Sequence, residues 1–297
     1  MSSGQAGDGG GQAYQRVADE LLSRLSGGRY PHNSSLPTQR QLAEEFGVSR
    51  DTVQKVLRML AGEGWIEARQ GSGTRVVRGP SSARRTGVQA AAQLGDRLDA
   101  AFRRPKVTLD VFTLTSQSLT AHLQVQAGLI RARHAEGKDI PREISVRILV
   151  PSENLLLAYP RALENSGDAR PQERLRAITR RHLSTLRSVL RELRADGLVP
   201  SVEVRVGRVP LTPAFKLYVL NRDDVLFGPY RLVERRMVFE DDTELPVLDV
   251  LGLGSPLTHF VRDGERPSKD SAFVESMQAW FDSVWNKLGV GDVTTDV

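Results

Sequence analysis

Hydrogen-bonding side chains gather in two neighbouring runs in the first quarter of the chain. One run extends from Leu36 to Leu60, and the other extends from Gln70 to Val77 and holds two glycines. The side chains concerned are Thr38, Arg40, Ser49, Arg50, Thr52, Gln54, Lys55, Arg58 and Gln70. Arginine forks match guanine and phosphate oxygens, and the glutamine amide matches adenine. This combination of residue types suits contacts with duplex DNA.

The residues between these donors predict two short helices joined by a tight turn. Pro37 ends any helix before it, and Thr38 with Gln41 three residues later forms a capping box. Gly47 is suited to the left-handed conformation that ends a helix. Ser49 is suited to cap the next one. The pattern is typical of a helix-turn-helix.

The second helix is predicted to be amphipathic. Apolar residues recur at the spacing of one helix face, at Val53, Val56, Leu57 and Leu60. The opposite face holds Arg50, Gln54, Lys55 and Arg58. A hairpin tipped by Gly71 and Gly73 follows. We therefore predict a winged helix-turn-helix whose second helix enters the major groove.

Residues from about Tyr14 to Val77 resemble the N-terminal DNA-binding domain of the GntR family of bacterial transcription regulators, above all over LPTQRQLAEEFGVSRDTVQKVLRMLAGEGWIEARQGSGTRV. The resemblance implies that Arg40 and Arg50 contact DNA, that Thr52 contacts a phosphate, and that Gly71 lets the wing approach the minor groove. Gln54 stands where many members carry arginine, which implies a different operator sequence. For Lys55 and Arg58, a plain solvent-facing role is equally open.

Composition limits the classes of protein to consider. The 297 residues suffice for two cores, and the lack of cysteine excludes disulfides and thiolate metal sites. The N-terminus does not resemble a secretion signal, and no apolar run is long enough to span a membrane. We expect a soluble, cytoplasmic protein without metal or cofactor. The first 105 residues hold 15 Lys and Arg against 10 Asp and Glu, so the whole net charge of +5 lies there, where it would attract phosphate.

The expected fold class is α/β overall, in an organisation of five parts. These are a disordered tail (1–11), the winged domain (12–78), a partly helical linker (79–105), an α/β effector-binding or dimerisation domain (106–290) and a second tail (291–297). Strands predicted near 107–114, 144–150 and 202–206 alternate with helices near 119–134, 174–195 and 271–288. This alternation predicts a mostly parallel sheet. Arginines of the long helix, including Arg176, are interpreted as a solvated face.

A second resemblance concerns residues 214–230. Their order looks like the phospholipase D motif, with Lys216 and Gly228 matching and Ala214 and Asn221 replacing the nucleophilic histidine and the carboxylate. Alanine cannot attack phosphorus, so the resemblance implies an inactive domain. A coincidental hairpin is the alternative.

A domain of this kind would still be able to hold an anion. Lys216 would supply charge, Asn221 and Tyr230 would supply hydrogen bonds, and Thr113, Thr115 and Ser152 follow strand ends where ligands of α/β sheets bind. The alternative is a domain that only dimerises.

The sequence as a whole predicts a dimeric transcriptional repressor. Its partners would be an operator duplex, a second copy of the chain and a small-molecule effector. The stripe Leu94, Leu98, Phe102 and the C-terminal helix are the expected dimer surfaces. The alternatives are a regulator with a UTRA-type ligand domain and a DNA-targeted nuclease or phosphodiesterase, against which Ala214 argues.

Overall fold

The chain divides into two compact units. The computed structural model describes residues 13–14, 16–18, 20–21, 24–25, 29–31, 33–62, 65–69, 73–77, 94–239, 243–251, 257–263 and 268–296. The first unit comprises Met1–Thr86, Arg161–Pro171 and Leu232–Asp249, and the second comprises Gly87–Pro160, Gln172–Arg231 and Val250–Val297.

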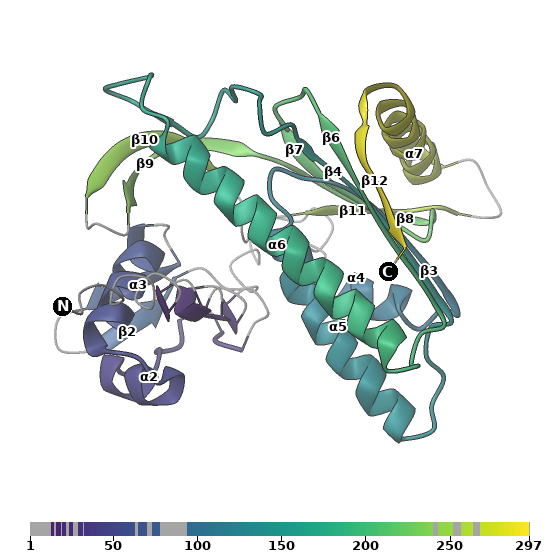
Figure 1. Ribbon diagram of the computed structural model, residues 1–297, viewed down its shortest axis with the longest axis horizontal. Helices are drawn as coiled ribbons and strands as arrows, with labels where there is room; N and C mark the ends of the chain where they lie inside the picture. Colours follow the sequence, from purple (N-terminus) through teal and green to yellow (C-terminus); the bar gives the residue numbers. More distant parts are fainter. Residues whose placement is uncertain are drawn as a thin grey trace, which may run out of the picture. The chain divides into compact units, whose positions relative to one another are not determined.

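The N-terminal part of the first unit is a small helical domain with a hairpin (Figure 1). Helical residues between 13 and 25 are followed by α2 (Gln39–Phe46), α3 (Arg50–Gly62), β1 (Ile66–Arg69) and β2 (Gly73–Val76). Its core is built by the apolar faces of these elements, with Leu21, Leu42, Val53, Leu60 and Trp65 all buried. The predicted winged helix-turn-helix is therefore confirmed as a fold.

A separate three-stranded sheet lies mostly in the first unit. Its order is β5 (Arg161–Ala162), β10 (Glu244–Leu251) and β9 (Arg231–Val238). Arg235 Nε donates to Asp249 Oδ2 at 3.0 Å, which joins β9 to β10 by a half-buried ion pair. None of these strands was predicted from the sequence.

The second unit is built on a seven-stranded sheet. Its strands are β3 (Lys106–Phe112), β4 (Glu143–Pro151), β6 (Ser201–Val209), β7 (Phe215–Leu220), β8 (Asp224–Pro229), β11 (Thr258–Val261) and β12 (Val290–Asp296). The order across the sheet is β11-β8-β7-β3-β4-β6-β12. Only the pairs β3–β4 and β4–β6 are parallel. The other neighbouring pairs are antiparallel.

The expected α/β class is confirmed, but the expectation of a mostly parallel sheet is wrong. Helical connections join β3 to β4 and β4 to β6, and a helix is long enough to return the chain for a parallel strand. A turn of residues 221–223 joins β7 to β8, and so short a connection permits only an antiparallel pair.

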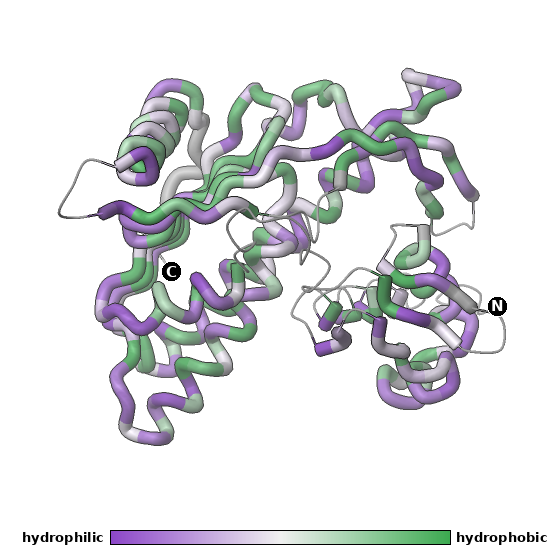
Figure 2. Tube along the Cα trace, turned by 180° about the vertical axis from the view of Figure 1, so that it is seen from behind, coloured by the Kyte–Doolittle hydropathy of each residue, from purple (hydrophilic) through white to green (hydrophobic). Residues whose placement is uncertain are grey.

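Helices cover both faces of this sheet (Figure 1). Helices α4 (Leu94–Ala101), α5 (Gln117–Ala135) and α6 (Arg170–Ala195) pack on one face, while α7 (Lys269–Leu288) packs on the other. Figure 2 shows that the central strands are largely hydrophobic, whereas the helices alternate hydrophilic and hydrophobic turns. This is the pattern of a sheet buried between two helical layers.

The structure corrects three expectations about this unit. Leu94, Leu98 and Phe102 are buried against the sheet, so they belong to the domain core and are not a free dimer surface. The apolar face of α7 likewise covers the sheet through Val274 and Phe281. The expected tail at 291–297 contributes strand β12, which pairs with β6. The expected tail at 1–11 and residues 79–93 of the expected linker lie outside the described residues.

A partly buried ion cluster joins α7 to the sheet. Arg147 of β4 donates from Nε to Asp110 Oδ1 at 2.7 Å and from Nη2 to Asp282 Oδ1 of α7 at 2.7 Å. Its guanidinium also lies 5.1 Å from the ring centre of Phe281. Removing one member of such a cluster leaves a buried charge without its partner, so the cluster holds α7 in one register.

Helices α4 and α5 meet at His122, and protonation of this side chain disfavours the folded state. A Cβ on Gly95 would lie 3.2 Å from Cε1 of His122, so α4 approaches that ring closely. Burial lowers the pKa of His122 to about 4, although nearby Asp96 acts to raise it.

We predict that His122 makes the second unit sensitive to acid. The unfolded chain protonates this side chain near its ordinary pKa of about 6.5, and the folded chain does so only near 4. Protons therefore favour the unfolded state, and stability is lost as the pH falls from about 6.5 towards 4. The unfolding temperature of a His122→Gln variant should fall less over this range than that of the wild type. Substitution of the exposed His134 on the same helix is the control. Parallel curves for wild type and His122→Gln would contradict the prediction.

Candidate nucleic-acid interface

The capping box that begins α2 is present as predicted. The Gln41 backbone N–H donates to Thr38 Oγ1 at 3.3 Å, and the Thr38 backbone N–H donates to Gln41 Oε1 at 2.8 Å. These two bonds satisfy backbone donors that a helix start would otherwise leave unpaired. They also place Arg40 in the first turn of α2, where its side chain is exposed and pairs with Glu44 at 3.0 Å.

The turn between α2 and α3 depends on Gly47. Its φ of 63° lies in the left-handed region, and its N–H donates to Glu44 O at 3.4 Å. Nothing lies within 4 Å of the position that a Cβ would occupy, so backbone conformation and not space demands glycine here. The Val48 N–H then donates to Ala43 O at 3.1 Å, which closes the turn.

Ser49 begins the second helix as expected. Its Oγ accepts the Thr52 backbone N–H at 3.1 Å and lies 2.9 Å from Thr52 Oγ1. Asp51 lies in the first turn, where the helix dipole favours a negative charge. The cap therefore fixes the start of α3 and aligns the Ser49 and Thr52 hydroxyls next to it.

Helix α3 separates its two faces as the sequence predicted. Val53, Val56 and Leu60 are fully buried, and Leu57 is nearly so. Arg50, Gln54 and Arg58 are exposed on the other side. Lys55 is half-buried and lies 3.5 Å from Asp51, so part of its charge is compensated within the helix. The exposed face presents an arginine fork, an amide and a second arginine in successive turns.

The hairpin that follows α3 is the wing. Its strands pair in an antiparallel register from Ile66 with Val76 to Arg69 with Gly73, and Gly73 has a φ of 78°. Backbone hydrogen bonds also join residues 33–36 to β2, so this segment lies alongside the hairpin. Gln70 and Gly71, expected at the wing tip, lie outside the described residues.

Arg24 has a structural role that the sequence did not lead us to expect. Arg24 of the first helix donates to Glu20 Oε1 at 2.6 Å and to Glu45 Oε1 at 2.5 Å, and it lies 5.0 Å from the ring centre of Phe46. These contacts join the first helix to α2. The signal available in the sequence was the Glu20 and Arg24 pair, four residues apart.

The residues expected to hold an effector do not all come together. Lys216 and Thr113 lie at the carboxyl end of β3, because Leu217 pairs with Phe112. Asn221 lies at the opposite end of that strand, where it accepts the Thr108 N–H at 2.8 Å and donates to Ala101 O at 3.3 Å. Asn221 thus supports the start of the sheet and is remote from Lys216.

The remaining effector candidates contact one another. Tyr230 Oη accepts the Leu114 N–H at 3.0 Å and lies 3.2 Å from Thr113 Oγ1, which in turn donates to Thr115 O at 3.0 Å. Burial raises the pKa of Tyr230 to about 12. The buried Lys216 ammonium lies 5.6 Å from the Tyr230 ring centre. Ser152 follows β4 and lines a pocket together with Leu114.

The described residues lack two further kinds of feature. No set of three or more His, Cys, Asp or Glu side chains among them is placed to bind a metal ion. None of the helices in those same residues combines the length and apolar character that crossing a membrane requires.

Comparison with known proteins identifies the N-terminal domain. Residues 13–76 match the family model described as bacterial regulatory proteins, gntR family. This segment is a GntR-family DNA-binding domain. The match includes α2, the turn at Gly47, α3 and both wing strands, and it ends before the second unit begins.

Two curated relatives are similar to this chain over a stretch about as long as this domain. The chain is 41% identical over 71 residues to the Uxu operon regulator of Haemophilus influenzae, covering 24% of this chain and 27% of that protein. It is 42% identical over 64 residues to the Exu regulon transcriptional regulator of Escherichia coli K12, covering 22% and 25%. Among solved structures, the DNA-binding domain of AraR in complex with operator ORR3 is 30% identical, with coverage of 26% and 88% and a TM-score of 0.22. The chain thus spans about a quarter of the length of these curated relatives.

We predict that Gly47→Ala destabilises the GntR-type domain by about 1–2 kcal/mol, because alanine in the left-handed region brings Cβ too close to the carbonyl oxygen. Gly47→Asn should reduce the stability of the domain less, since asparagine tolerates this conformation. Urea unfolding followed by circular dichroism measures both losses. Equal stability of Gly47→Ala and the wild type would show that the turn does not require glycine at this position.

Proposed function

We propose that the chain is a sequence-specific transcriptional regulator that binds operator DNA as a dimer and represses the genes beside it. The observation that carries the proposal is the exposed polar face of α3 on a GntR-family domain. The curated relatives that share this domain are named as regulators of operons and regulons, which supports the same role. The proposal includes a location in the cytoplasm, where bacterial DNA lies.

The proposed contacts follow from position on the domain. Arg50 and Gln54 lie on the exposed face of α3 and would reach base edges. The two helix starts and the rest of α3 would contact phosphates, and the wing would approach the minor groove. This second set is Thr38, Arg40, Ser49, Thr52, Lys55, Arg58, Gln70, Gly71 and Gly73.

The second unit is proposed to serve dimerisation and regulation without catalysis. In the hairpin of β7 and β8, Lys216 pairs with Gly228, and the exposed Ala214 stands just before β7. The only ground for relating this unit to an inactive phospholipase D domain is the residues at these positions. The family match ends at residue 76 and does not support that relation. Alanine has no atom able to form a covalent phosphoryl intermediate.

We predict that Arg50→Ala weakens binding to the preferred operator by about 1–3 kcal/mol, the usual worth of a bidentate base contact. Fluorescence anisotropy with labelled duplex at one fixed salt concentration measures the loss. The control is Arg191→Ala, which removes an exposed arginine of α6 in the second unit. If both variants bind like the wild type, Arg50 does not read the operator.

A further prediction concerns assembly. Simultaneous contact with two half-sites raises the affinity for DNA without any new contact, so the chain should be a dimer through residues beyond about 88. The stripe on α4 and the apolar face of α7 are used inside the domain, so the interface must lie elsewhere. Sedimentation at micromolar concentration should give twice the mass of the 32.8 kDa chain. A monomer both free and on operator DNA would overturn the proposal of a dimer.

A further inference from the structure

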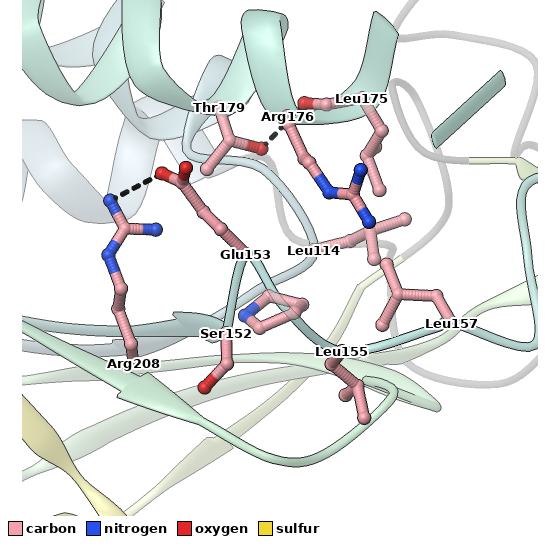
Figure 3. Close-up of a pocket in the computed structure, with 10 residues that line it drawn as sticks. Leu114, Ser152, Glu153, Leu155, Leu157, Leu175, Arg176, Thr179 and Arg208 are labelled. Carbon is pink, nitrogen blue, oxygen red and sulfur yellow. Dashed lines mark hydrogen bonds and ion pairs between the residues drawn. The ribbon is translucent and has the colours of Figure 1, made fainter. Parts of the chain in front are cut away.

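An open pocket lies where the three parallel strands of the second unit end (Figure 3). Leu114 follows β3, Ser152 and Glu153 follow β4, and Arg208 is near the end of β6. Helix α6 closes the other side with Leu175, Arg176 and Thr179. Ligands of open α/β sheets bind outside the carboxyl ends of parallel strands, so this pocket is in the position where a ligand is expected.

One wall of the pocket is apolar and held in place. Its apolar lining consists of Leu114, Pro151, Leu155, Leu157 and Leu175. The buried amide of Gln172 donates to Leu157 O at 2.8 Å and accepts the Leu157 N–H at 3.2 Å. The Leu114 N–H is held by Tyr230 Oη at 3.0 Å. Because both leucines are fixed by hydrogen bonds, a ligand would meet a wall that is already formed.

The charged groups at the pocket leave it positive. Glu153 is compensated twice, by Arg180 at 3.0 Å and by Arg208 at 2.9 Å. Within the described part of the chain, Arg176 forms no ion pair with an acidic side chain. Figure 3 shows its guanidinium directed towards Leu114 and Leu157, on the side of the pocket away from Arg208. A cation beside an apolar wall is suited to a ligand that carries a negative charge next to hydrocarbon.

We propose that this pocket binds a small organic acid, with its carboxylate on Arg176 and its hydrocarbon part against the leucines. The arginine fork can donate to both carboxylate oxygens at once. The five apolar residues of the wall favour such an acid over inorganic phosphate, which has nothing to place against them. The pocket is open on one side, and about 300 Å³ of free space lies at it when the adjoining solvent is included.

Calorimetric titration of the full chain with simple probes tests the site. Hexanoate and benzoate carry both chemical features, whereas acetate, hexanol and inorganic phosphate each lack one. We expect at least one of the first two to bind at millimolar concentration or below, and the last three to bind more weakly. If neither hexanoate nor benzoate binds, or if acetate binds equally well, the proposal is wrong.

Three variants then locate the bound carboxylate. Arg176→Gln should raise the dissociation constant of the bound acid about tenfold or more, as expected for loss of a charge-assisted hydrogen bond. Arg191→Gln, an exposed arginine on the same helix, should leave it unchanged. Glu153→Gln should lower it, because a carboxylate that repels the ligand is removed. Equal affinity for wild type and Arg176→Gln would place the acid elsewhere and overturn the assignment.

The role of this pocket as an effector site rests on the proposed function. Acid binding at the pocket and operator binding by the chain can nevertheless be tested independently. Operator binding is measured on the same proteins in the absence of acid. Arg176→Gln should bind the operator like the wild type, and an unchanged unfolding temperature of the second unit would show that its loss of acid binding is not a loss of fold. Acid binding without any operator binding would contradict the proposed regulator and leave the site intact. Operator binding without acid binding would contradict the site alone.

Discussion

The left-handed backbone at Gly47 is the constraint on which the proposed DNA-reading surface depends. It ends α2 and turns the chain within three residues, so that Ser49 can cap α3. The buried faces of both helices then meet in one core, and the opposite face of α3 is left exposed. A β-branched or bulky residue at this position would be strained, because only glycine adopts this conformation without cost. Every proposed base contact is therefore positioned by a residue that touches no base.

In the second unit, the connections between strands determine where the pocket lies. Two helical connections make β3, β4 and β6 parallel, so their carboxyl ends meet at one edge of the sheet. The same edge receives the start of α6, which brings Arg176 and Leu175 over those strand ends. The hairpin of β7 and β8 adds Tyr230, which holds Leu114 in the wall. The pocket is thus a consequence of topology, with side chains supplied by four separate segments.

Features that depend on residues close in sequence were predictable, and features that depend on distant partners were not. The capping box at Thr38, the glycine turn and the two faces of α3 are set by spacings of three or four residues. An apolar stripe, in contrast, does not reveal what covers it, and so Leu94 and Leu98 were taken for a dimer surface although the sheet covers them. The separation of Asn221 from Lys216 depends on strand register, and Arg176 was interpreted as part of a solvated face because its pocket is formed by other segments.

Selection of bound duplexes from a random pool tests the central claim most directly. With the wild-type chain, the account predicts two related half-sites in inverted orientation, since two copies of one domain would read them. Repeating the selection with Gln54→Arg should change one base position in each half-site, towards guanine, and leave the spacing as it was. Enrichment of no sequence by the wild type, or the same sequence with both proteins, would contradict the claim that the exposed face of α3 reads an operator.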